Sequence, residues 1–194
     1  MKNVIKRGLL SVALLATIVA QATNKIAVKN SKDKKVEISM TSEVGGETLS
    51  IVDTKDEVLF TERLQKGNWL HKTFDFSTAP EGIYFIQSKE AGRIEVTPVI
   101  VAEDKVTVLE DSKKVFKAPS VTLNDKIAKV LINNFNKSEV KLSILNEDGV
   151  EIYNTHNHEL VTYSAFNLDK LPSGEYTVIT KIADYSFEDT IELK

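Results

Sequence analysis

The chain of 194 residues carries two copies of one pattern. Each copy has an apolar run that begins Leu-Ser-Ile and, further on, the run Pro-x-Gly-x-Tyr. At offsets of 93, 92 and 92 residues, the matching segments are 49–53 with 142–146, 74–76 with 166–168, and 80–84 with 172–176. Upstream, Val36 and Ile38 align with Val130 and Ile132 at an offset of 94. So many similar residues in one order indicate two copies of one module.

Each copy is predicted to consist of short β-strands. Val36, Ile38 and Met40 alternate with polar residues, as in a strand with one buried face. In the second copy, Asp148-Gly149 joins two apolar runs, which is a hairpin signal because Gly accepts a positive φ. No convincing amphipathic helix follows residue 22. Short strands separated by turn residues predict an all-β fold of two tandem antiparallel sandwiches.

Residues 1–22 are predicted to be a secretory signal peptide. A positive start with Lys2, Lys6 and Arg7 precedes an apolar stretch over 8–20, and Ala20-Gln21-Ala22 places small residues where a signal peptidase reads. We expect the mature protein to begin at Thr23; the alternative is a retained N-terminal anchor.

The mature chain is predicted to hold module 1 at residues 23–101, a connector at 102–114 and module 2 at 115–194. The connector is dense in charges but includes Val106, Val108 and Leu109. It is therefore either a short strand that extends the first sheet or a stiff spacer, since it has no Gly.

Composition excludes several functional classes. There is no cysteine, so disulfides, thiolate metal sites, thiol nucleophiles and a lipoprotein anchor are excluded. A net charge of -3 argues against nucleic-acid binding. No segment after residue 22 has the roughly 20 apolar residues of a membrane span. Without a Gly-x-Ser-x-Gly motif or a phosphate loop, we expect no enzyme and no cofactor.

A turn and a corner motif mark the end of the second copy. Segment 146–150 reads Asn-Glu-Asp-Gly-Val, segment 168–176 reads Leu-Asp-Lys-Leu-Pro-Ser-Gly-Glu-Tyr, and a last strand follows. This pattern, over residues 130–194, resembles the C-terminal sorting domain of the type IX (Por) secretion system. The first copy carries the pattern less fully. The chain is also similar to small secreted two-module proteins of uncharacterised function.

The resemblance implies immunoglobulin-like sandwiches and export across the inner membrane, to the periplasm, cell surface or medium. The predicted function is a non-catalytic binding or cell-surface interaction module. The alternative is a type IX secretion substrate whose module 2 acts as the sorting signal. Partners would be secretion machinery, an envelope protein or a glycan, and the mature chain is not expected to be an integral membrane protein.

Six residues at equivalent places are predicted to shape a tyrosine corner, in which a Tyr hydroxyl bonds to nearby backbone where the chain crosses between sheets. These residues are Pro80, Gly82 and Tyr84 in the first copy and Pro172, Gly174 and Tyr176 in the second.

Three side chains are candidates for ligand contact. His156 and His158 would share one face of a strand and could bind zinc or copper, although their segment also reads as a turn. Trp69 could stack on a sugar, but its counterpart is Val161, which favours packing.

Segment 186–193 is a candidate docking edge, because every sandwich leaves edge strands whose backbone groups can pair with another chain. The residues proposed for it are Ser186, Phe187, Thr190 and Ile191. The first copy carries Pro98 in its closing strand, a residue tolerated mainly at edges. Pro98 and the acidic residues Glu188, Asp189 and Glu192 could instead serve only to protect the edges from aggregation.

Overall fold

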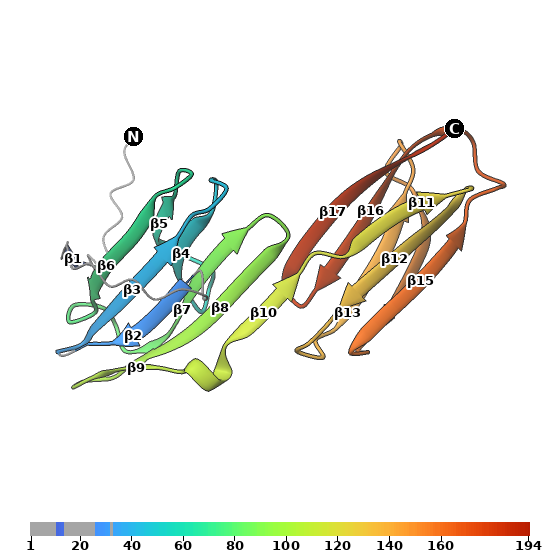
Figure 1. Ribbon diagram of the computed structural model, residues 1–194. Helices are drawn as coiled ribbons and strands as arrows, with labels where there is room; N and C mark the ends of the chain where they lie inside the picture. Colours follow the sequence, from blue (N-terminus) through green and yellow to red (C-terminus); the bar gives the residue numbers. More distant parts are fainter. Residues whose placement is uncertain (1–10, 14–25, 32) are drawn as a thin grey trace, which may run out of the picture. The chain divides into compact units, whose positions relative to one another are not determined.

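The computed structural model describes residues 11–13, 26–31 and 33–194, and divides into two compact units, Met1–Lys114 and Val115–Lys194 (Figure 1). The predicted signal peptide lies outside the described residues, except for the short strand β1 (Ser11–Ala13). Among the described residues, no helix is long and apolar enough to cross a membrane.

The first unit is a sandwich of two antiparallel sheets. One sheet has the order β1-β6-β3-β2, and the other has the order β8-β7-β4-β5 with β9 beside β8. A single 3-10 turn, η1 (Glu110–Ser112), follows β9. The strand bounds are β2 Ile26–Asn30, β3 Lys35–Thr41, β4 Thr48–Asp53, β5 Val58–Arg63, β6 Trp69–Asp75, β7 Gly82–Glu90, β8 Arg93–Val101 and β9 Val106–Val108.

The second unit repeats this arrangement. Its sheets have the orders β11-β12-β15 and β14-β13-β16-β17, which match β2-β3-β6 and β5-β4-β7-β8 strand for strand. The prediction of tandem immunoglobulin-like sandwiches is confirmed. The bounds are β11 Ser120–Asn124, β12 Ile127–Asn133, β13 Val140–Leu145, β14 Glu151–Asn157, β15 Val161–Asn167, β16 Gly174–Ile182 and β17 Tyr185–Leu193, while β10 (Lys114–Lys117) spans the boundary between the units.

Alternating side chains fill the space between the sheets. In β3, Val36, Ile38 and Met40 are buried, as their spacing predicts. Each such side chain contributes about 1.5–3 kcal/mol by leaving water. An aromatic pair packs at the equivalent place in each unit: Phe60 on Phe74 with ring centroids 4.8 Å apart, and Tyr153 on Phe166 at 5.3 Å.

Our upstream alignment of β3 with β12 at an offset of 94 is wrong, because the strand pairing gives an offset of 92. Val36 pairs with Phe74, and Ala128 pairs with Phe166, so Val36 corresponds to Ala128 at an offset of 92. A slip of two residues returns every side chain to the same face of a strand. Alternation in the sequence therefore cannot distinguish the two alignments.

The segment expected as a connector lies in the first unit. Its strand β9 pairs with the end of β8, and Val106 and Val108 join the first hydrophobic core. The amide of Val108 also donates to Asn30 Oδ1 of β2 at 2.8 Å. Of the two predicted forms, the segment takes that of a short strand extending the sheet.

A buried carboxylate shapes the loop between β3 and β4. Glu47 is 1% exposed; its Oε2 accepts from the Ser42 hydroxyl and its Oε1 from the Val44 amide. These contacts, the Ser42 hydroxyl foremost, lower the pKa of Glu47 despite its burial. In the second unit Asn134 holds the equivalent loop, with Oδ1 accepting from the Ser138 amide at 3.0 Å.

We expect Glu47→Gln to lower the melting temperature of the mature protein at pH 7, because the amide offers fewer acceptors to the loop. A carboxyl whose pKa is lowered by folding stabilises the fold above its unfolded pKa, and that stability is lost as pH falls through the folded pKa. The difference between wild type and variant should therefore shrink between pH 6 and pH 3, as measured by thermal melts. Glu57→Gln, at an exposed position, is the control. A constant difference across this range would contradict the role of the ionised Glu47.

Candidate binding surfaces

Both predicted corner tyrosines donate hydrogen bonds to backbone. The Tyr84 hydroxyl lies 2.7 Å from the Pro80 carbonyl oxygen, and the Tyr176 hydroxyl lies 2.8 Å from that of Pro172. Both rings are buried. Burial, and then the charge of Asp53, raise the pKa of Tyr84. In both units the hydroxyl is thus bonded to the backbone of the turn that precedes its own strand.

The glycine of each corner starts a strand at a backbone angle that other residues rarely adopt, with φ at +151° for Gly82 and +156° for Gly174. At Gly174 a Cβ would also lie 2.6 Å from Glu147 Oε1. That oxygen accepts from the Glu175 amide at 2.9 Å. The carboxylate of Glu147, in the turn between β13 and β14, thus lies against the start of β16 in the second unit. Beside Tyr84 in the first unit there is instead an open hollow of about 310 Å³.

The two candidate metal ligands lie in different surroundings. His156 is on β14 directly opposite Lys141 of β13, and His158 follows the end of that strand. Both are exposed. Over the part of the chain that the structure describes, there is no group of three acidic or histidine side chains able to hold a metal ion. A cation opposite His156 adds repulsion to any metal at that place.

Exposed aromatic and apolar side chains occupy equivalent positions of β6 and β15. The expectation that Trp69 packs is wrong: its side chain is 55% exposed, and its counterpart Val161 is 52% exposed. Two residues on, His71 hydrogen-bonds with the Ser39 hydroxyl at 2.8 Å, and its counterpart Tyr163 is 63% exposed. Tyr163 lies directly opposite the exposed Leu131 of β12. Each unit thus has an exposed patch on the outer face of the same strand. The patch is Trp69 in the first unit, and Val161 and Tyr163 with the neighbouring Leu131 in the second.

The predicted docking edge is at the end of a sheet. β17 pairs with β16, and no other strand of the described chain lies beside it in the sheet order. Along it, Ser186 and Thr190 are exposed, Phe187 is half-buried and Ile191 is buried. Its first-unit counterpart β8 is different, because β9 covers Val99–Val101 and the Leu109 amide donates to the Pro98 carbonyl. Pro98 therefore does not lie on an open edge.

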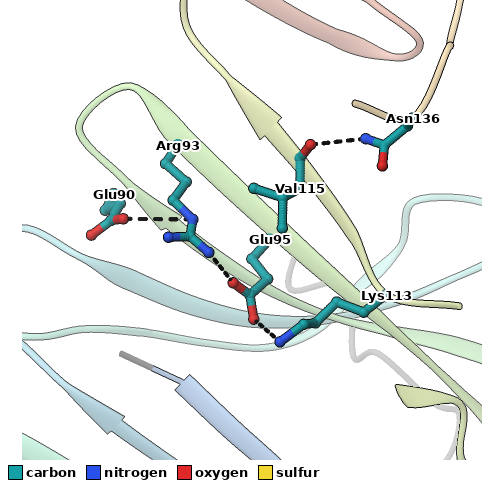
Figure 2. Close-up of polar contacts among 6 residues, drawn as sticks. All are labelled: Glu90, Arg93, Glu95, Lys113, Val115 and Asn136. Carbon is teal, nitrogen blue, oxygen red and sulfur yellow. Dashed lines mark hydrogen bonds and ion pairs between the residues drawn. The ribbon is translucent and has the colours of Figure 1, made fainter. Parts of the chain in front are cut away.

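Sequence reasoning missed a buried charge on β8. Glu95 is 6% exposed and forms ion pairs with Arg93 at 2.6 Å and with Lys113 at 2.8 Å (Figure 2). Glu90 lies 3.9 Å from Arg93. A carboxylate between Ile94 and Val96 in an apolar strand is the signal that could have revealed it. Lys113 thereby holds the end of segment 102–114, the predicted connector, to the first unit.

The first residues of the second unit, Val115 and Phe116, contact side chains of that unit. The Asn136 amide Nδ2 donates to the Val115 carbonyl oxygen at 2.8 Å (Figure 2). Next to Val115, Phe116 is buried and stacks on Tyr185 at 4.5 Å. Lys113 is therefore held by a side chain of the first unit, whereas Val115 and Phe116 are held by side chains of the second unit.

Residues 21–102 match the family described as a secretion system C-terminal sorting domain. The predicted resemblance is confirmed, but the match lies on the first module, whereas we expected it mainly on residues 130–194. The fold thus defines tandem immunoglobulin-like modules, of which the first is sorting-domain-like. No curated protein matches the chain.

Two solved structures are similar to the chain. One is the BSP domain of a biofilm associated protein, with 14% identity over 88% of this chain and 29% of that one, and a TM-score of 0.31. The other comprises domains FN1–FN3 of chicken CNTN1, with 10% identity over 87% of this chain and 66% of that one, and a TM-score of 0.31. The chain spans less than two thirds of either. Likeness at this level carries no information about function.

We expect Tyr176→Phe to destabilise the protein by roughly 1–2 kcal/mol, because the Pro172 carbonyl loses its buried donor. The measurement is the free energy of unfolding of the mature protein by urea titration. Tyr163→Phe, which removes a hydroxyl from a ring that is mostly exposed, is the matched control and should have little effect. Equal effects of the two substitutions would remove the stabilising role of the corner.

Proposed function

We propose that the chain is a non-catalytic, exported binding protein whose two modules contact protein or glycan at the cell envelope. The observation that carries this proposal is the pair of equivalent patches on β6 and β15. Trp and Tyr combine a large apolar area with a polar group and few rotatable bonds, which suits them to interfaces. Trp69 and its counterpart Val161 are both exposed, and this shared exposure of one strand position favours a shared use over chance placement.

The sorting-domain match supports export by the type IX secretion system, to the cell surface or beyond. A second candidate function is that module 2 serves as the address read by that system. Its support is the close correspondence of the two modules: the same strand order, and the same hydroxyl-to-proline bond at the corner.

For export, we expect the full chain to reach the medium or the cell surface in a bacterium with a working type IX system, and to remain in the periplasm when that system is inactivated. Cell fractionation with immunoblotting measures both. Equal export in the two strains would contradict the proposed route. Removal of residues 115–194 then tests the address: undiminished export of a truncated chain with a native-like circular dichroism spectrum would exclude module 2 as the signal.

For binding, we expect the mature protein to bind purified outer-membrane vesicles or envelope polysaccharide from its own bacterium. The double variant Trp69→Ala, Tyr163→Ala should bind at least about tenfold more weakly. Each substitution removes an aromatic ring that becomes buried on binding, and such a contact contributes about 2 kcal/mol or more. Val150→Ala, at an exposed apolar residue in the turn between β13 and β14, is the control. Undiminished binding by the double variant in a sedimentation assay would exclude these patches.

A further inference from the structure

The first unit shows what can occupy the edge that the second unit leaves open. In the first unit, β9 pairs antiparallel with Val99–Val101 at the end of β8. The equivalent residues are Ile191–Leu193 of β17, because Tyr84 pairs with Val99 just as Tyr176 pairs with Ile191. No strand of the described chain lies on that side of β17.

The backbone groups that receive β9 can be assigned residue by residue. The Leu109 amide donates to the Pro98 carbonyl, and the Ala102 amide donates to the Lys105 carbonyl, each at 2.9 Å. Because hydrogen-bonded pairs alternate in an antiparallel ladder, Ile100 between them exchanges both bonds with Thr107. The outward-facing backbone groups of β17 are therefore those of Thr190 and Glu192.

The apolar cover that β9 supplies also has no counterpart in the second unit. Val106 and Val108 lie in the first core together with Val28 of β2. The residue equivalent to Val28 is Val121 of β11, since Val28 pairs with Ile38 and Val121 with Val130. Val28 is buried, whereas Val121 is half-exposed, and so is Leu123 two residues on.

Charge distinguishes the two edges. In the first unit, Ile100 lies opposite Ile83 on the neighbouring strand. In the second unit, the same positions are Glu192 and Glu175, two carboxylates directly opposite each other. Like charges in this position repel, and a basic side chain from a third strand would offset that repulsion.

We infer that Thr190–Leu193 accepts an antiparallel strand from a partner protein. That strand has β-branched apolar residues where β9 has Val106 and Val108, and a basic residue between them that faces Glu192. This inference deepens the proposed binding function by naming the kind of partner that one edge takes.

The probes are two synthetic peptides tested on the mature full chain. One copies residues 103–110, and the other carries the substitution Thr107→Lys. We expect both to bind, the T107K peptide at least about tenfold more tightly at low salt, as one added ion pair of about 1.4 kcal/mol gives. Fluorescence anisotropy measures affinity, and amide chemical shifts of residues 190–193 locate the site. Failure of both peptides to bind at millimolar concentration overturns the inference, and leaves the proposed envelope binding to its own assay.

Two proline variants supply a matched pair. Glu192→Pro removes the central outward N–H and should abolish binding of both peptides, since a proline cannot donate to the added strand. Thr190→Pro should retain binding, because Pro98 occupies the equivalent position beside the paired β9. Equal binding by the two variants, each with a native melting temperature, overturns the inference. Should Glu192→Pro not fold, Glu192→Gln must remove the preference for the T107K peptide, and a preserved preference overturns the inference equally.

Discussion

Apolar side chains packed in the space between two sheets hold each unit of this protein together. The chain has no cysteine, so no disulfide adds to this packing. Every strand must therefore keep the register that places its apolar residues inside. The turns serve this requirement locally, as in the hairpins where Asp53 and Asn146 bind the amides two and four residues on. The corner tyrosines serve it at the point where the chain enters β7 and β16.

The features predicted from the sequence are those with local signals. Alternation in β3, the Asp-Gly turn at Gly149 and the Pro-x-Gly-x-Tyr runs each depend on residues close together in the chain. From them the number of modules and their sandwich architecture follow. The alignment of β3 with β12 failed because a shift of two residues changes no side chain's face. The correspondence of Val36 with Ala128 is seen only from the neighbouring strands β6 and β15, where Phe74 and Phe166 lie opposite these two residues.

The contacts that sequence reasoning missed join residues far apart in the chain. Nothing near Glu95 shows that Lys113 will reach it, and nothing near Asn30 shows that it will bind the Val108 amide. For the same reason the connector could be described only as a strand or a spacer. The candidate surfaces were predictable only in part. The acidic residues of β17 are evident in the sequence, whereas Trp69 was expected to pack and is exposed. The open backbone of one edge and the covered backbone of the other depend on strand order.

The placement of β9 also bears on how copies of this chain could join one another. A strand that pairs with the edge of one module fits, by the internal symmetry of the repeat, the corresponding edge of the other. Release of β9 from its own unit would let it enter the second unit of a neighbouring molecule, and each neighbour could do the same, giving head-to-tail polymers by strand exchange. The ion pairs of Glu95 with Arg93 and Lys113 fasten the chain just beyond β9. Such an exchange would have to break the ion pair that holds Lys113 to Glu95 of β8.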